Sequence, residues 1–594
     1  MKYDLLTEIL DSIRKESPNY KPGEDNEDAL SQARCKAYIH LLLKVKFKIN
    51  DFTEREKFIT DKSQDGGLDA YYIDKNNKII YLIQSKFRTT ESNFEKKDIE
   101  LDELVKMEYD KIMGGEHLDS RGTKYNSKII NFQKELKSIS GISRYKYKIL
   151  VLANLKKYNG YQIDKVIGKY TYEIFDYKKT YEELIYPMCT SSYHKNINID
   201  IDLHQENISI LNEKFEVEVG KCEVNIVFLP VYKIAEIMSK YKNSVLKYNP
   251  RNYISISKST VNNKIYTSVI KDTSQEFAIL NNGITIICDD FNSTEQTGKQ
   301  NRSQISIDNP QFINGAQTSY TLSKVYNSKD KERLRDKKVM VRFIKVDLRE
   351  GIDREKDQYK KFIQKISDAT NTQNKVNESD KKSNRPDQEK FQAYIYREFG
   401  YLYERKVGEF DPLLSNENIN TKNIKDLIIE RSDLIRSRIA YKGKARFAMN
   451  TKGDKLFTEK NLDEVFSKEE DYKDIFLSYL VYKKILEKEK ECKEVKEKEL
   501  NYRYGVTYGK FVMLNAISII RLKFFKDRDC NGYKDICTLA EELLGYVLKE
   551  WKKFEEYAKS VNKDLDINDR VKMYSYYKTV KSEGNVKDFF ESIV

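Results

Sequence analysis

Cysteine and histidine are scarce and scattered in this chain. The 7 cysteines are odd in number, and no two of them form a CxxC pair. This spacing argues against a disulfide framework and against a structural zinc site. The 4 histidines are too dispersed for a histidine-rich metal centre. Any metal must therefore be held by oxygen ligands, which favours magnesium or a similar hard cation.

Long apolar runs and structure-breaking residues are also lacking. No run approaches the roughly 18–20 apolar residues that span a bilayer. The amino terminus, MKYDLLTEILDSIRKE, has acidic residues where a signal peptide has its apolar core. With 8 prolines and 23 glycines in 594 residues, the chain is neither collagen-like nor dominated by linkers. We expect a soluble, cytoplasmic protein with no membrane partner.

The residues that are present can build a substantial core. Hydrophobic residues make up 39% of the chain and aromatic residues 12%, which excludes a wholly disordered protein. A length of 594 residues exceeds a single core and indicates two to four domains. The formal net charge of +13 permits a polyanionic partner such as nucleic acid. Because this surplus is spread over a long chain, it permits that partner without indicating it.

The hydrophobic periodicity predicts an α/β protein in three parts. Residues 1–190 alternate helical and strand patterns, with a helix expected from Glu27 to Val45 and more helical structure through DIELDELVKMEYDKI (98–112). Residues 200–410 are mixed α/β, with strand patterns in CEVNIVFLPV, EFAILNNGITIICDDF and KKVMVRFIKVD. Residues 420–594 are mostly helical.

The strongest local pattern is a hairpin in SQDGGLDAYYIDKNNKIIYLIQSKF, residues 63–87. Asn76 and Asn77 suit the positive-φ positions of a two-residue turn. Counting back from that turn places Asp69 opposite Gln84, with Tyr71 opposite Leu82 and Ile73 opposite Ile80. Both faces of the two strands are largely apolar, which predicts a sheet covered by helices on both sides.

Three polar side chains then collect at one end of one face: Asp69, Gln84 and Lys86. Lys86 lies opposite Gly67, which leaves space beside the ammonium group. A carboxylate and an amide oxygen can hold a divalent cation there, and a lysine can stabilise phosphate charge. The alternative is an ordinary ion pair between Asp69 and Lys86 at the end of a sheet. A register slip of one residue would separate Asp69 from Gln84.

GGLD followed by QSK resembles the restriction-endonuclease-like core of the PD-(D/E)xK superfamily, in the variant with glutamine at the second acidic position. The resemblance implies metal-dependent phosphodiester hydrolysis with Mg²⁺ or Mn²⁺, and with Asp69, Gln84 and Lys86 as core residues. Glutamine removes one negative charge, so a further carboxylate ligand is expected. The superfamily often takes it from a preceding helix. Glu27 is the candidate, with Glu8 and Asp65 as alternatives.

The central part is rich in side-chain amides within apolar surroundings. Asn282–Gly283 between apolar runs indicates a hairpin, and Asn314–Gly315 indicates a turn that enters a helix. Buried amides must pair with one another, with backbone or with a ligand. Amides also pair bidentately with base edges, so these are candidate substrate-binding residues: Asn282, Asn314, Gln317, Asn371 and Gln373.

Several segments in this part resemble the AIPR family, the abortive-infection phage-resistance proteins. They are NPRNYI (249–254), FAILNNGITI (277–286), NPQFINGAQTSYTL (309–322), ISDATNTQNKVNESD (366–380) and YERKVGEF (403–410). The resemblance covers roughly residues 220–500 and implies bacterial antiphage defence through damage to nucleic acid.

Together these patterns predict a metal-dependent nuclease coupled to a central module that senses or handles substrate. The expected partner is nucleic acid, DNA before RNA, with a phage-derived trigger, and a homodimer would allow both strands of a duplex to be cut. The alternative is a non-catalytic defence protein, with a degenerate nuclease fold that binds nucleic acid or senses a nucleotide.

Overall fold

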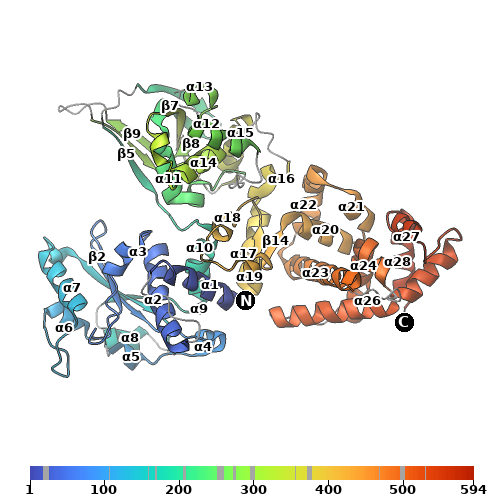
Figure 1. Cartoon of the computed structure of the whole chain (residues 1–594), viewed down its shortest axis with the longest axis horizontal. Coiled ribbons are helices and arrows are strands. Elements are labelled where there is room, and N and C mark those ends of the chain that lie inside the picture. Colours follow the sequence, from blue (N-terminus) through green and yellow to red (C-terminus); the bar gives the residue numbers. More distant parts are fainter. Residues whose placement is uncertain are drawn as a thin grey trace.

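A computed structural model describes residues 1–17, 26–105, 107–157, 160–167, 170–204, 209–250, 260–271, 276–294, 302–354, 356–370, 378–466, 468–494, 502–526, 528, 530 and 532–593. Figure 1 shows an amino-terminal module (residues 1–197) beside a central module (198–370), with a helical region (431–593) extending away from both. A joining segment (378–430) lies between the three. The expected mixed α/β chain with a helical carboxyl-terminal part is confirmed.

The amino-terminal module is built on one four-stranded sheet in the order β1-β2-β3-β4. β1 is antiparallel to β2, whereas β2, β3 and β4 are parallel. The strands are β1 Ala70–Asp74, β2 Ile79–Ser85, β3 Lys146–Leu152 and β4 Thr171–Ile174. The helices are α1 Lys2–Arg14, α2 Glu27–Val45, α3 Phe52–Lys57, α4 Glu91–Lys96, α5 Leu101–Val105, α6 Tyr109–Gly114, α7 Ser127–Ser138, α8 Gly160–Ile167, α9 Tyr177–Thr180 and α10 Tyr186–Thr190.

Helices cover both faces of this sheet, as the doubly apolar strands predict. On one face Ala70 and Ile83 pack into a core with residues of α1 and α2. On the other face Tyr71 and Leu82 pack with residues of α7. The expected helix from Glu27 to Val45 is confirmed as α2, and the Asn26 side chain caps it by accepting from Ala29 N at 3.0 Å.

The hairpin register is confirmed, but its turn differs from the expected one. Tyr71 pairs with Leu82 and Ile73 with Ile80. The positive φ lies at Lys78 and not at the two asparagines. The Asp74 carboxylate organises the turn instead, because it accepts from Asn77 N at 2.9 Å and from Asn77 Nδ2 at 2.8 Å. The apolar pattern of the strands therefore sets the register independently of the turn.

The helical pattern over residues 98–112 is confirmed in two short helices. The structure divides this stretch into α5 and α6. Tertiary bonds take backbone groups that a continuous helix would need: Ile99 O accepts from Lys156 N at 3.0 Å, and Glu108 N donates to Gly66 O at 2.7 Å.

The central module contains two sheets, with strand orders β11-β8-β12-β7-β6 and β5-β10-β9. Its strands are β5 Asn198–His204, β6 Leu211–Val217, β7 Gly220–Pro230, β8 Ile284–Cys288, β9 Asp290–Thr294, β10 Arg302–Asp308, β11 Gln311–Asn314 and β12 Lys338–Leu348. Its helices are α11 Val231–Tyr241, α12 Thr260–Lys271, α13 Phe277–Leu280, α14 Ala316–Tyr326 and α15 Asp357–Thr370. The module's main core lies between the strands and helices α11 and α14.

The two Asn–Gly pairs have different outcomes. Asn282–Gly283 does not form the expected hairpin turn; it leads from the short helix α13 into β8. A run of four apolar residues fits helix and strand equally well, and here the chain enters the sheet from a helix. Asn314–Gly315 enters α14 as predicted, with Gly315 at φ 81° as its amino-terminal cap.

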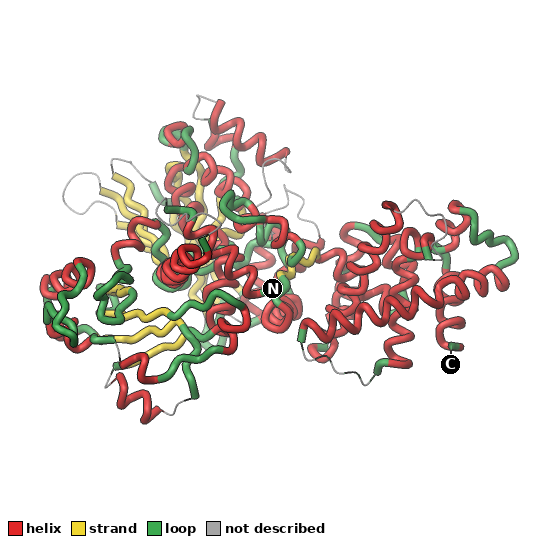
Figure 2. The backbone as a smooth tube through the Cα atoms, turned by 60° about the horizontal axis from the view of Figure 1, so that its bottom comes forward, coloured by secondary structure: helices red, strands yellow, loops and turns green. Residues whose placement is uncertain are grey.

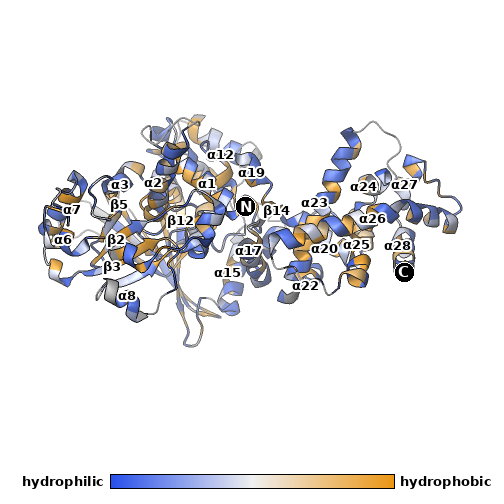
Figure 3. Ribbon diagram, turned by 90° about the horizontal axis from the view of Figure 1, so that it is seen from below, coloured by the Kyte–Doolittle hydropathy of each residue, from blue (hydrophilic) through white to orange (hydrophobic). Residues whose placement is uncertain are grey.

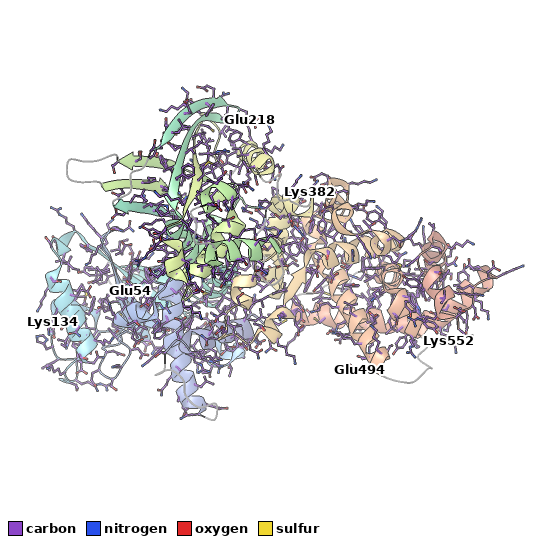
Figure 4. The ribbon with its side chains drawn as sticks, turned by 45° about the horizontal axis from the view of Figure 1, so that its top comes forward. Glu54, Lys134, Glu218, Lys382, Glu494 and Lys552 are labelled. Carbon is purple, nitrogen blue, oxygen red and sulfur yellow. The ribbon has the colours of Figure 1, made fainter. Side chains whose placement is uncertain are left out.

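The joining segment packs against the amino-terminal module as well as the helical region. Leu402, Phe410 and Leu413 belong to the same core as α1 and α2. Tyr396 Oη also donates to Tyr181 O at 2.9 Å. The segment contains α16 Glu378–Lys381, α17 Pro386–Phe399, β13 Leu402–Glu404, α18 Asp411–Leu414, α19 Thr421–Lys425 and β14 Ile428–Glu430. In Figure 4, Lys382 marks the place where this segment meets the helical region, and its ammonium donates to Glu459 Oε1 at 2.6 Å.

The helical region has its own large apolar core. Figure 2 shows helices throughout its described residues, and Figure 3 shows their apolar residues gathered where the helices face one another. The helices are α20 Arg431–Tyr441, α21 Ala445–Asn450, α22 Glu459–Phe466, α23 Tyr472–Glu494, α24 Arg503–Tyr508, α25 Lys510–Phe524, α26 Tyr533–Val561, α27 Arg570–Tyr576 and α28 Val580–Ser592. Among the residues described, none of the chain's helices has the length and apolar content needed to cross a membrane.

Two glycines give a matched test of packing in the helical region. A Cβ at Gly505 would lie 2.1 Å from Nε1 of the fully buried Trp551, whereas a Cβ at Gly545 meets nothing within 4 Å. We expect Gly505→Ala to destabilise the region by about 1–3 kcal/mol through overpacking. Gly545→Ala, within α26, should stabilise it by up to about 1 kcal/mol. Trp551 is the chain's one tryptophan, so denaturant unfolding followed by its fluorescence reports this region. Equal midpoints for the two variants would contradict the packing.

Candidate metal centre

The candidate site is built on the loop that enters β1. Thr60 N and Asp61 N both donate to Asp69 O, at 2.9 and 3.0 Å, so the two ends of the loop lie side by side. Gly66 and Gly67 turn the chain between them with φ of 64° and 76°. A Cβ at Gly66 would lie 2.9 Å from atoms of Ile112 and Tyr125. Glycine is therefore required at Gly66 by both its backbone conformation and the close approach of α6.

This loop gathers the carboxylates of Asp61, Asp65 and Asp69. Each offers an oxygen, and these oxygens all lie within 4.8 Å of one another. The loop also orients two of the groups directly: Asp65 Oδ1 accepts from Gly67 N at 2.8 Å, and Asp69 Oδ2 accepts from Ser85 N at 2.6 Å. Carboxylates so close together repel one another, and a hard divalent cation relieves that repulsion.

Gln84 contributes a buried oxygen beside this cluster. Extending the β1–β2 register by one pair sets Asp69 opposite Gln84, and Asp69 N donates to Ile83 O at 3.0 Å. The Gln84 side chain is 3% exposed, and its Nε2 lies 3.5 Å from Glu103 O. Its Oε1 has no hydrogen-bond partner among the described atoms. A buried acceptor without a partner fits a ligand position for a cation.

Lys86 lies near the cluster without forming the ion pair of the alternative interpretation. Burial raises the pKa values of Asp65 and Asp69, and the charge of Lys86 opposes that rise. Among the residues that the structure describes, however, no carboxylate forms an ion pair with its ammonium. The ammonium group is therefore available to a phosphate bound beside the carboxylates.

Burial and mutual repulsion control the protonation of the cluster. The pKa of Asp69 is raised to about 7, chiefly by burial and also by the charges of Asp61 and Asp65, while the hydrogen bond from Ser85 N and the charge of Lys86 act in the opposite direction. Burial also raises the pKa of Asp65 above its usual value. Without a cation, Asp69 is therefore partly protonated at neutral pH.

The carboxylates expected from the preceding helices are not brought to this site. Glu27 is exposed in the first turn of α2. Cys35, farther along α2, lies close enough to the cluster to be affected by its charge. Its pKa is raised to about 11, chiefly by burial and also by the charges of Asp61 and Asp69. Glu27 and Cys35 are eight residues apart on this helix, which corresponds to about 12 Å along its axis. Glu8 Oε2 instead accepts from Asn420 N at 3.2 Å in the joining segment.

Of the candidates for the further carboxylate ligand, Asp65 is the one that the structure places in the cluster. Asp61 also belongs to the cluster and was not predicted from the sequence. Asp61, Asp65 and Asp69 recur at intervals of four residues. That spacing carries structural meaning only on a helix. Here the bonds between the two ends of the loop bring them together.

The central amides have partners within the protein or lie away from a common site. Asn314 Nδ2 donates to Thr370 O at 2.9 Å, and its Oδ1 accepts from Gly315 N at 2.7 Å. Gln317 Oε1 accepts from Asn262 Nδ2 at 3.0 Å. Asn282 is exposed at the start of β8. Asn371 and Gln373 lie outside the described residues.

The chain is similar to one known family. A family model described as AIPR protein matches residues 246–568, which is more than half of the chain. The chain therefore belongs to the AIPR family, and the family implies a role in phage defence by abortive infection. No curated protein and no solved structure matches the chain. The match begins after the amino-terminal module, so it says nothing about the carboxylate cluster.

Metal binding at this cluster should depend steeply on pH. Protons compete with the cation for Asp69, because its pKa is raised to about 7. We expect Mg²⁺ or Mn²⁺ affinity, measured by calorimetry, to fall up to about tenfold for each pH unit below 7. Asp69→Asn should remove most of the binding and weaken its pH dependence near pH 7. Glu27→Gln, at an exposed position on α2, should behave as wild type. Undiminished binding by Asp69→Asn would exclude this site.

The same pKa predicts how stability changes with pH without metal. Between pH 3.8 and about 7, folded Asp69 keeps a proton that the unfolded chain has lost. The free energy of unfolding therefore falls as the pH rises through this range. Asp69→Asn removes this loss, so it should raise the melting temperature relative to wild type at pH 8 in EDTA. The difference in melting temperature between Asp69→Asn and wild type should become smaller toward pH 4. Circular dichroism melts at both pH values test this, and a constant difference would contradict it.

Proposed function

We propose that the amino-terminal module is a metal-dependent nuclease that hydrolyses nucleic-acid phosphodiesters in phage defence. The observation that carries this proposal is the gathering of Asp61, Asp65 and Asp69 beside an unpartnered, buried Gln84 oxygen. The family shared by residues 246–568 supplies the defence context. The PD-(D/E)xK resemblance of Asp69, Gln84 and Lys86 supplies the reaction class.

The donor set fits magnesium or manganese. Asp61, Asp65 and Asp69 offer carboxylate oxygens, and Gln84 Oε1 offers a neutral oxygen. Oxygen donors of this kind are the ligands that these cations prefer. The three carboxylates also compensate for the charge that glutamine lacks. A divalent cation held there supplies Lewis acidity and charge neutralisation for phosphodiester hydrolysis.

The chain's own residues perform the remaining tasks. Lys86 has no carboxylate partner among the described residues, so its ammonium can donate to a phosphate oxygen as charge develops. Lys86, Arg88 and Lys97 line one small cavity beside Tyr38, which groups three cationic side chains near the cluster. Positive charge so placed attracts a phosphate backbone. DNA is the preferred substrate of the proposal, and a homodimer would place two such sites on a duplex.

Cleavage assays with matched lysine variants test the proposal. Plasmid DNA, single-stranded DNA and RNA are each incubated with the full chain and Mg²⁺ or Mn²⁺. We expect Asp69→Asn to abolish cleavage and Lys86→Met to reduce it by about 100-fold, because a donor to the developing charge is lost. Lys134→Met removes an exposed lysine from α7, seen at the edge of the molecule in Figure 4, and should retain full activity.

Two results would overturn the nuclease proposal. Equal cleavage by wild type, Asp69→Asn and Lys86→Met would place the activity elsewhere. Metal binding at Asp69 with no cleavage of any of the three substrates would instead assign a non-catalytic binding role to the module. Plaque assays with the same variants then show whether phage defence requires the cluster.

A further inference from the structure

A second site lies where the amino-terminal module, the central module and the joining segment meet. A cavity of about 630 Å³ is lined by α10 and the segment after it, by one end of the central sheets and by the joining segment. This volume falls within the range of small-molecule sites. It is lined by Tyr186, Tyr248 and Tyr359 as well as by polar and charged side chains. Neither the carboxylate cluster nor its neighbours contribute to it.

Two buried polar atoms on this cavity have no hydrogen-bond partner within the part of the chain that the structure describes. Asn243 is 8% exposed; its Nδ2 donates to Thr190 O at 2.8 Å and to Glu409 O at 3.3 Å, but its Oδ1 accepts nothing. His194 is 6% exposed, and its Nε2 is also without a partner. Burying an unsatisfied polar atom is unfavourable, so each points to a ligand group that completes it. Asn243 Oδ1 requires a donor, such as an N–H group.

The charge on the cavity wall favours an anion. Asp289 is paired with Arg354 at 2.6 Å, and Glu389 with Arg405 at 3.3 Å. The third lining carboxylate, Glu409, accepts from the backbone N of Arg405 at 3.1 Å and from Gln392 Nε2 at 2.9 Å. The carboxylates on the wall are therefore already bound by groups of the protein.

Lys406 supplies a buried amine on the same wall. Its pKa is lowered to about 7, chiefly by burial and also by the charge of Arg405, while Glu409 and Glu389 oppose that shift, so a bound anion would favour the charged ammonium. Lys406 is 3% exposed, and its ammonium donates to Leu246 O at 3.1 Å and to Lys247 O at 2.8 Å. Among the described residues it forms no ion pair, so one N–H of the ammonium remains for a ligand. Exposed Lys195 adds a second positive charge on the cavity lining.

The backbone around the cavity is held in unfavourable conformations. Asn196 and Asn309 line the cavity with φ of 51° and 47°. Ser191 and Lys242, each next to a lining residue, have φ of 52° and 46°. Non-glycine residues rarely adopt positive φ, and such strain concentrates at binding sites because the surrounding structure must maintain it.

We propose that this cavity binds a free nucleotide, with its phosphate groups at Lys406 and Lys195 and an N–H group of its base donating to Asn243 Oδ1. A phosphate satisfies an ammonium that has no carboxylate partner. A flat base suits a wall that carries three tyrosines. The inference is independent of phosphodiester cleavage, because it uses none of the residues of the carboxylate cluster. Since the walls come from the amino-terminal module, the central module and the joining segment, a bound nucleotide would contact each of them.

Calorimetric titration of the full chain with ATP, GTP and cyclic di-AMP tests this proposal. EDTA in the buffer removes any contribution of a metal at the carboxylate cluster. At least one nucleotide should bind with a dissociation constant below 1 mM. Lys406→Met should weaken it at least tenfold, because a charge-assisted hydrogen bond is lost. Lys195→Glu, at an exposed position that tolerates substitution, should weaken it as well.

Control variants separate this site from the rest of the molecule. Lys549→Met, on the exposed face of α26, should leave nucleotide binding unchanged. Asp69→Asn should also leave it unchanged, so failure of the nuclease proposal does not affect this one. The wild-type chain is also titrated with adenosine, inorganic tripolyphosphate and a ten-nucleotide single-stranded DNA. Adenosine and tripolyphosphate should each bind at least tenfold more weakly than the best nucleotide.

Several outcomes would overturn the proposal. One is the absence of binding by all three nucleotides, and another is binding that neither Lys406→Met nor Lys195→Glu weakens. Equal affinity for tripolyphosphate would show that the base is not recognised. Binding of the oligonucleotide without binding of any free nucleotide would assign the cavity to the end of a nucleic-acid strand.

Discussion

The carboxylate cluster depends on the backbone bonds made at Asp69. Its carbonyl accepts from Thr60 N and Asp61 N, its N–H donates to Ile83 O, and its carboxylate accepts from Ser85 N. These bonds tie the loop to the start of β1 and to the end of β2. They therefore hold like charges together against a repulsion that would otherwise separate them. The pKa of Asp69 is raised because the attached carboxylate is buried and lies close to Asp61 and Asp65.

The hairpin could be predicted because its information is local. Alternating apolar residues determine which faces of β1 and β2 are buried, so the register Tyr71–Leu82 follows even when the turn is assigned wrongly. The bounds of α2 follow from the Asn26 cap and the buried Ala37 and Leu41 that come after it. The position of Asp61 could not be predicted in this way, because bonds between the two ends of a loop place it beside Asp69. The break between α5 and α6 has a similar origin, since Glu108 N bonds to Gly66.

The central module shows the same division between local and distant information. Its amide-rich segments led to the prediction of a ligand site, but Asn314 and Gln317 form hydrogen bonds within the protein. Asn243 instead has an amide oxygen with no partner among the described residues, and it lies in a stretch with no distinctive motif. Two of the segments that carry the AIPR resemblance nevertheless line the proposed nucleotide cavity, through Gln311 and Lys406. Residues more than 90 positions apart form one wall there, which is why composition and spacing could not reveal it.

The joining segment has a practical consequence for dividing the protein. Its Leu402, Phe410 and Leu413 complete the apolar core that α1 and α2 begin, almost four hundred residues earlier in the chain. A fragment that stops near residue 190 would leave that apolar surface in water and would tend to aggregate. Supplying residues 378–430 as a separate polypeptide would cover it again. The amino-terminal module is thus completed by chain that is synthesised long after it, so it reaches its final fold late in translation.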